Sequence, residues 1–280
     1  MGRFRRGWAL TKKSRSLLRS HPGLFRFPIY GAAASTIATL VVVGPGLYLI
    51  DGSSTGAGVV VLAVGLYLLA LVGLYFSVGL AAAADLTFRG REVSVGDGLA
   101  VARQRFGAIA GWAALSTAVG VVLGLLEDQG GIAGAIFGRL LAIGWSLITF
   151  LAVPVIALEG TGPFETLKRS AGLFRDRWGQ QVTGNLAIGG AVTLLGVLPG
   201  AALIAGGIAI WASSGFAGAV LVIVGVIVLA VALVVSRALS GIFGVALYRY
   251  ALEGQAVGGF SASELESAVR TKGAPAPSTI

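Results

Sequence analysis

Six long apolar stretches, separated by polar segments, set the pattern of this chain. Each stretch has about 20 residues or more, which is the length that an α-helix needs to cross the hydrocarbon core of a bilayer. The pattern therefore predicts an all-α integral membrane protein, a six-helix bundle that forms one membrane domain over residues 1–270. The expected transmembrane spans are 27–50, 57–84, 107–126, 132–158, 181–211 and 216–250.

The polar segments between the spans alternate in length and in charge. The short segments at 51–56, 127–131 and 213–215 contain no Lys or Arg. The long segments and the two termini hold all but two of the 21 Lys and Arg residues, the exceptions being Arg139 and Arg237. Cytoplasmic loops are enriched in Lys and Arg. We therefore expect a multi-pass protein of the cell membrane, with both termini and both long loops in the cytoplasm.

Short motifs recur at equivalent places along the chain. The sequences "RQRFG" (103–107) and "RDRWG" (175–179) each precede an odd-numbered span. Spans two, four and six end at the carboxylates Asp85, Glu159 and Glu253. These motifs predict three direct repeats of one orientation, each an amphipathic interfacial helix followed by a transmembrane hairpin. The alternative is that short loops rich in Arg and Gly resemble one another by composition. The expected repeats are about 1–85, 86–159 and 160–253.

The loop at 163–178 has the spacing of an amphipathic helix. Its apolar side chains recur at intervals of three and four residues, which places them on one helical face. Glu165 and Arg169 have the i, i+4 spacing of a favourable ion pair. The apolar positions are Phe164, Leu167, Ala171, Phe174 and Trp178.

The loop at 94–106 repeats this pattern. Ser94 and Asp97 have the spacing of a capping box, with Asp in place of the usual Glu. Basic amphipathic helices with aromatic anchors lie in the lipid headgroup layer, and this interpretation is favoured here over packing against other loops. The apolar positions are Val95, Leu99, Ala102 and Phe106. The residues expected to face lipid headgroups are Arg103, Arg105, Lys168, Arg169, Arg175, Arg177 and Trp178.

Composition supports a membrane protein and excludes several kinds of chemistry. Charged residues make up 12% of the chain, against about 25% in soluble proteins. The chain has no cysteine and one histidine, His21, so thiol catalysis, disulfides and the usual zinc sites are excluded. We expect no cofactor, no metal and no catalytic residues, and no nucleic-acid partner, because the net charge of +9 follows from the cytoplasmic segments. The tail at 271–280 is expected to be disordered.

Arg237 is the strongest functional candidate, because a charge in the bilayer centre costs about 2.5–3.5 kcal/mol on the insertion scale. In a continuous helix it lies about 18 Å from Arg249, which marks the cytoplasmic boundary. Ser240 shares its helical face, so Arg237 and Ser240 form a candidate intramembrane polar site. In the alternative interpretation, the last span crosses at 216–236 and residues 238–252 lie flat on the membrane.

Two segments resemble a known family. The sequences "ALEGTGPFETLKRSAGLFRDRWG" (157–179) and "IFGVALYRYALEG" (242–254) are similar to a family of bacterial and archaeal polytopic membrane proteins of unknown function. More loosely, "LKRS" with the following "RW" is similar to the membrane domain fused to some glycerophosphodiester phosphodiesterases, whose catalytic domain has no counterpart here. The resemblance implies a six-helix bundle and no established function.

Two hypotheses for function follow. The leading one is a non-enzymatic membrane scaffold or lipid-interacting protein, with anionic headgroups at the cytoplasmic face and an unidentified membrane protein as partners. The alternative is a transporter or channel with a polar site near Arg237. The sequence leaves the substrate and the oligomeric state open.

Overall fold

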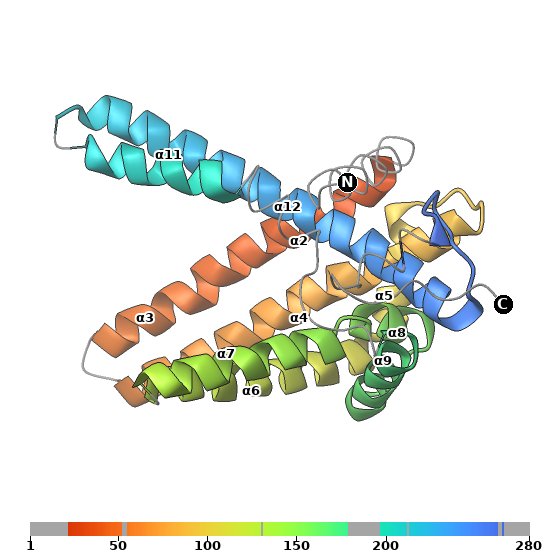
Figure 1. The fold of residues 1–280 in the computed structure, drawn as a ribbon. Helices are drawn as coiled ribbons and strands as arrows, with labels where there is room; N and C mark the ends of the chain where they lie inside the picture. Colours follow the sequence, from red (N-terminus) through yellow and green to blue (C-terminus); the bar gives the residue numbers. More distant parts are fainter. Residues whose placement is uncertain are drawn as a thin grey trace.

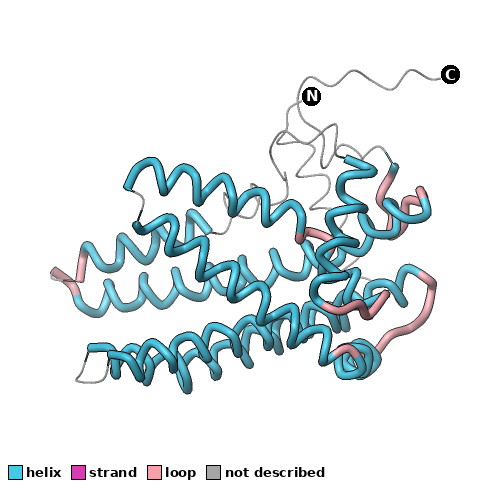
Figure 2. Tube along the Cα trace, turned by 90° about the horizontal axis from the view of Figure 1, so that it is seen from below, coloured by secondary structure: helices cyan, strands magenta, loops and turns pink. Residues whose placement is uncertain are grey.

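The computed structural model describes residues 22–51, 55–129, 131–178, 197–211, 213–262 and 265. Within these ranges the secondary structure is helical and contains no strand. The elements are α2 (Pro22–Ala38), the π-helix η1 (Thr39–Val43), α3 (Gly44–Asp51), α4 (Thr55–Phe88), α5 (Val95–Gln104), α6 (Phe106–Gln129), α7 (Gly131–Ile148), α8 (Ala152–Leu158), α9 (Pro163–Trp178), α11 (Leu198–Ala209) and α12 (Gly215–Glu253). Figure 2 shows these helices, with short loops where the connections belong to the described residues.

Five stretches of the described chain are long and apolar enough to cross a membrane. This finding supports a multi-pass membrane protein. The first combines α2, η1 and α3, and the fourth combines most of α7 with α8. The five stretches are Gly23–Leu49, Gly56–Phe88, Phe106–Leu126, Ile136–Leu158 and Gly215–Glu253.

The predicted span at 181–211 lies mostly outside the described residues, as do the N-terminal segment and the tail at 271–280. Its described part contains α11, which has 12 residues and a length of about 18 Å. The six-helix bundle with three repeats is therefore not confirmed. The described residues do confirm an all-helical fold, with five helices long and apolar enough to cross a membrane.

The fourth span is interrupted where the sequence predicted one helix. Between α7 and α8, the chain makes a turn at Thr149–Leu151. Pro154 explains the interruption, because it has no N–H with which to bond the carbonyl group of Phe150. The freed backbone groups at this turn need other partners, and α9 supplies one of them, as described below.

The last span is one continuous helix. The helix α12 has 39 residues, which corresponds to about 58 Å. It ends at Gly254, whose left-handed φ of 69° suits glycine at this position. Residues 242–248 are all buried in the protein core, so other helices cover this segment, while the depth of Arg237 in a membrane stays a prediction.

The core lies at one end of the bundle. Two clusters of buried side chains join the last turns of α4 and α12 to α8, α9 and the start of α6. Figure 1 shows α11 and the first half of α12 projecting from this core, on the side away from α6 and α7. The packed end and the projecting hairpin together define the positions of the candidate sites.

Candidate functional site

Three carboxylates lie at the end of the bundle where α4, α8 and α12 terminate. We call this region the charged end and define it by Asp85, Glu159 and Glu253. The sequence pattern had assigned the same three residues to the ends of the even-numbered spans. In the structure they are joined by two neighbouring residues of α12, Tyr248 and Arg249.

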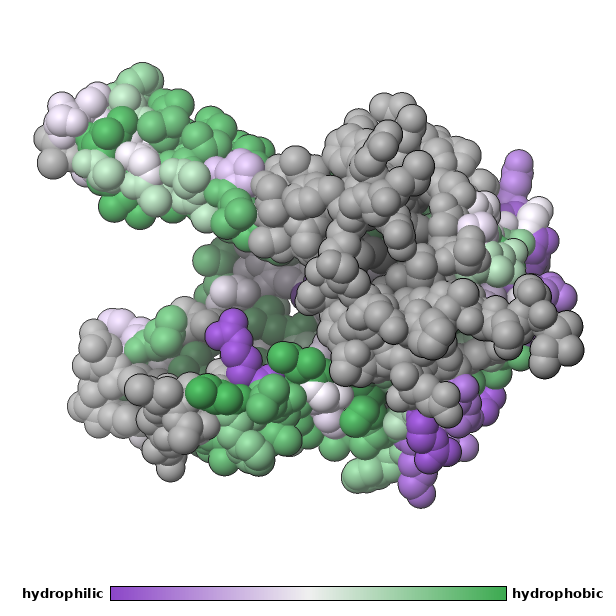
Figure 3. Space-filling view, viewed as in Figure 1, coloured by the Kyte–Doolittle hydropathy of each residue, from purple (hydrophilic) through white to green (hydrophobic). Residues whose placement is uncertain are grey.

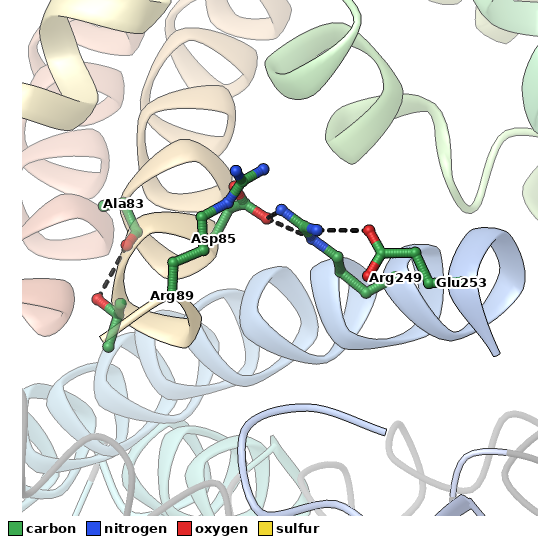
Figure 4. A network of polar contacts seen from close by, with 6 residues as sticks. Ala83, Asp85, Arg89, Arg249 and Glu253 are labelled. Carbon is green, nitrogen blue, oxygen red and sulfur yellow. Dashed lines mark hydrogen bonds and ion pairs between the residues drawn. The ribbon is translucent and has the colours of Figure 1, made fainter. Parts of the chain in front are cut away.

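Arg249 connects two of the carboxylates, as Figure 4 shows. Its Nη2 lies 2.6 Å and its Nε 2.7 Å from Oδ1 of Asp85, while its Nη1 lies 2.5 Å from Oε1 of Glu253. Arg89 donates a further hydrogen bond to Asp85 over 3.0 Å. Asp85 is only 3% exposed, so the ion pair with Arg249 is well shielded from solvent. Both Nη2 and Nε of Arg249 reach the same carboxylate oxygen, and charge-assisted hydrogen bonds of this kind are stronger than neutral ones.

Glu159, which follows α8, accepts hydrogen bonds from residues of α12 and α9. The hydroxyl of Tyr248 donates to Oε1 of Glu159 over 2.7 Å. Nε of Arg169, from α9, donates to the same oxygen over 2.9 Å. The hydrogen bond to Glu159 raises the pKa of the Arg169 guanidinium. The predicted pair between Glu165 and Arg169 is therefore wrong, because Arg169 reaches a carboxylate in the preceding loop instead.

Ser170 of α9 forms hydrogen bonds with the backbone at the interruption between α7 and α8. Its hydroxyl donates to the carbonyl oxygen of Ile148 and accepts a hydrogen bond of 3.2 Å from the N–H of Leu151. Ser170 is fully buried. Buried backbone groups need such partners, so this side chain fixes α9 against the interrupted span.

The two predicted interfacial helices pack on the bundle through their apolar faces. In α5, Ala102 is fully buried, and Val95 and Leu99 pack against the core. In α9, Phe174 is buried whereas Phe164 is 69% exposed. Contact with other helices therefore buries much of the apolar surface that the sequence pattern assigns to lipid. The capping box is confirmed: the Ser94 hydroxyl accepts from the Asp97 N–H over 3.3 Å, and Asp97 accepts from the Ser94 N–H over 2.8 Å.

The basic residues of these two helices have different surroundings. Arg103, Lys168 and Arg175 are exposed. Arg105 packs against Gly160, and its buried Nε has no hydrogen-bond partner among the described residues. The side chains of Arg177 and Trp178 lie outside the described part of the structure. A location of these helices at a lipid interface stays a prediction.

A cavity of about 720 Å³ lies between α2, α4 and α12. Its volume falls in the range of about 300–1,000 Å³ that is typical of ligand sites. Most of its lining is apolar, and no Asp or Glu occurs among the described residues that line it. Arg237 lines this cavity, but Ser240 does not. The polar side chains of the lining are Ser35, Thr36, Ser77, Ser116 and Arg237.

Three of these polar side chains have no partner. Thr36 and Ser77 each donate a hydrogen bond to the backbone one turn earlier in their own helix. Among the residues that the structure describes, none forms a hydrogen bond or an ion pair with the side chain of Ser35, Ser116 or Arg237. The cavity therefore offers hydrogen-bond donors and one positive charge without a matching anion.

Arg237 could be identified from the sequence, but Ser35 and Ser116 could not. Hydroxyl groups are common in apolar spans and give no distinct signal. The link from Arg249 to Asp85 was also missed, since the two residues are 164 positions apart. A usable signal was present in the spacing of Arg249 and Glu253, which form an i, i+4 pair at the end of the last span.

The comparisons with known proteins identify a family. A family model described as a family of unknown function, DUF6159, matches residues 56–259. Neither the comparison with curated proteins nor the comparison with solved structures finds a match. The looser similarity to the membrane domain of glycerophosphodiester phosphodiesterases stays a prediction.

Proposed function

We propose that this chain, which belongs to the DUF6159 family of unknown function, is a non-enzymatic integral membrane protein that interacts with anionic lipids. The observation that carries the proposal is the position of its exposed basic side chains. Six of them lie on α5, on α9 and just after α4, close to the charged end, whereas the exposed Arg26, Arg139 and Arg237 lie on α2, α7 and α12. The six are Arg89, Arg91, Arg103, Lys168, Arg169 and Arg175.

The rest of the surface supports an orientation in which the charged end lies at the inner leaflet. Figure 3 shows hydrophilic side chains gathered at the packed end and hydrophobic ones over the projecting hairpin of α11 and α12. The short polar segments at the opposite ends of the helices contain no Lys or Arg. Each Lys or Arg near an anionic membrane surface contributes about 1 kcal/mol of attraction. With the charged end at the inner leaflet, both long loops are cytoplasmic and their basic side chains contact anionic headgroups.

The full chain in lipid nanodiscs tests this proposal. Energy transfer from the tryptophans to dansyl phosphatidylglycerol, compared with dansyl phosphatidylcholine, measures the preference for anionic lipid. The triple variant Arg103→Gln, Lys168→Gln, Arg175→Gln should lower that preference at least fivefold, given about 1 kcal/mol per charge. Arg139→Gln removes a basic residue of α7, away from the charged end, and should leave the preference unchanged. An unchanged preference in the triple variant contradicts the proposal.

A transporter or channel is the second candidate, and the cavity at Arg237 favours it. Intramembrane ionisable residues commonly mark the pathways of substrates or ions. Because the chain contains no natural cysteine, single cysteines at positions 237 and 240 can be probed with charged thiol reagents. Reaction at 237 is expected for a water-accessible pathway. Complete protection of both positions would exclude one.

A further inference from the structure

We propose that the cavity between α2, α4 and α12 binds one anionic amphiphile, with its charged oxygens on Arg237 and its hydrocarbon chain on the apolar lining. The proposal concerns a site distinct from the basic surface at the charged end. It extends the lipid interaction proposed above to one defined molecule, and it can fail or succeed independently.

The charge of the ligand follows from the side chains that line the cavity. Arg237 brings a guanidinium, and Ser35 and Ser116 bring hydroxyl donors, all three without partners in the described chain. The side chain of Arg237 is exposed on the protein surface, and a charge that lies within a bilayer pairs with an opposite charge or with other polar groups. Because none of the described residues that line this cavity carries a carboxylate, the proposal assigns the compensating charge to the ligand. A cation would meet Arg237 without any acidic side chain to offset it.

The hydrocarbon part of the ligand follows from the position of the cavity. Arg237 precedes Arg249 by twelve residues of the continuous helix α12, so it lies about 18 Å from the charged end. With the charged end at the inner leaflet, as proposed above, this distance places Arg237 inside a hydrocarbon core of roughly 30 Å. The lining beside it includes Leu69, Leu74 and Leu233. A small anion would use only Arg237 and the hydroxyl groups, whereas an amphiphile also places its hydrocarbon chain among the apolar side chains of the lining.

Native mass spectrometry of the full chain in an uncharged detergent tests the site. The probes are oleate, which carries a carboxylate, oleoyl lysophosphatidate, which carries a phosphate, and monoolein, which is uncharged. One equivalent of at least one anionic probe should bind more tightly than monoolein, and the tighter anion identifies the headgroup chemistry. Failure of both anionic probes to bind, or equal affinity for monoolein, would overturn the proposal.

Substitution of Arg237 separates its charge from its bulk. Arg237→Gln should weaken anion binding about tenfold or more, the expected effect of losing hydrogen bonds to a charged group. Arg237→Lys should stay within about threefold of the wild type, because it keeps the charge. Arg139→Gln removes an arginine of α7 that does not line the cavity, and should change nothing. Equal anion affinity in Arg237→Gln and wild type would refute the site.

Filling the cavity provides a second and independent test. A Cβ at Gly73 would lie 3.9 Å from Nη1 of Arg237, so a larger side chain enters the cavity without meeting the backbone. Gly73→Leu should therefore block the anionic probes, whereas Gly120→Leu, on the open surface of α6, should not. Thermal unfolding of both variants verifies folding. Unaltered binding in Gly73→Leu would place the ligand elsewhere. Triple substitution of the surface residues Arg103, Lys168 and Arg175 should leave probe binding intact.

Discussion

The two halves of α12 pack in opposite ways. The C-terminal half is buried among α2, α4, α8 and α9 and contributes large side chains such as Ile242, Phe243 and Leu247 to the core. The N-terminal half packs on α11 through glycines. A Cβ at Gly207 would lie 2.7 Å from the carbonyl oxygen of Gly218, and one at Gly225 would lie 2.8 Å from that of Gly200.

This difference shows how the surroundings select the packing. Lipid tails are as apolar as leucine, so the hydrophobic effect does not drive helices together inside a bilayer. Small residues that allow the backbones to approach then provide the contact, as they do between α11 and α12. At the charged end the helices meet through bulky side chains and ion pairs. These contacts hold the C-terminal ends of α4, α8 and α12 in fixed positions.

The largest effect should come from breaking the buried ion pair. Asp85→Asn leaves Arg249, whose side chain is 14% exposed, without its most buried partner. Loss of one partner of a buried pair costs about 3–5 kcal/mol, and the remaining contact with Glu253 favours the lower end. The free energy of unfolding in detergent should fall by about 3 kcal/mol.

Asp176→Asn is the matched control for that substitution. Asp176 pairs with Arg175 over 3.5 Å, and both side chains are largely exposed. Exposed pairs contribute about 0–1 kcal/mol. Equal destabilisation by Asp85→Asn and Asp176→Asn would mean that the charged end is not held by its buried pair.

A smaller effect should come from the glycine contact of the hairpin. Gly207→Leu places its side chain against the backbone of α12, and overpacking of this kind costs about 1–3 kcal/mol. Gly206→Leu, at the next position, meets nothing within 4 Å and should be tolerated. A disulfide between cysteines at 200 and 229, where a Cβ at Gly200 lies 3.1 Å from Cβ of Leu229, reports the packing. Its yield should fall only in Gly207→Leu, and equal yields would show that the glycines do not set the contact.

Removing the hydroxyl of Ser170 should have a lesser effect at the packed end. Ser170→Ala leaves the buried carbonyl of Ile148 and the N–H of Leu151 without this partner. The expected loss is about 1 kcal/mol or slightly more, measured by thermal unfolding. Ser213→Ala removes an exposed hydroxyl that bonds the carbonyl of Ile210 and should have no measurable effect. Equal stability of Ser170→Ala and the wild type would show that the interruption of the span needs no support from α9.

The smallest effect concerns the exposed capping box of α5. Hydrogen bonds from the N–H and hydroxyl of Ser94 lower the pKa of Asp97. The folded state thus holds the charged carboxylate more readily than the unfolded state. The stabilisation is present above the ordinary Asp pKa and is lost as the pH falls through the lowered value. Amide exchange in the first turn of α5 should increase over that acidic window. Asp97→Asn should abolish the dependence, whereas Ser94→Ala, which keeps the backbone N–H, should only reduce it. The same pH dependence in Asp97→Asn would contradict this assignment.

Local features of the fold could be predicted from the sequence. The helices α4, α6 and α12 follow from continuous apolar runs of sufficient length, and the capping box follows from Ser94 and Asp97. Interruptions of helices were harder to predict, because a single proline such as Pro154 does not reveal whether a helix bends or ends. Nothing in the apolar run around Thr39–Val43 indicates a π-helix.

The pairing of distant residues could not be predicted. Arg169 had Glu165 one turn away, yet it binds Glu159, because the turn of the loop brings that carboxylate closer. Asp85 and Arg249 meet only because α4 and α12 run side by side. The lining of the cavity could not be predicted for the same reason. Arg237 was a candidate because of its expected position within the last span. Ser35 and Ser116 come from other helices, which only the fold brings close to it.

Photocrosslinking of a bound amphiphile tests the central claim most directly. A fatty acid with a diazirine in its chain is bound to the full protein at about one equivalent and irradiated, and the labelled peptides are identified. We expect labels concentrated in α2, in residues 69–80 of α4 and in residues 230–237 of α12, and lost in Arg237→Gln. Labels spread over α3, α11 and the other exposed apolar surfaces, and unaffected by Arg237→Gln, would contradict the account.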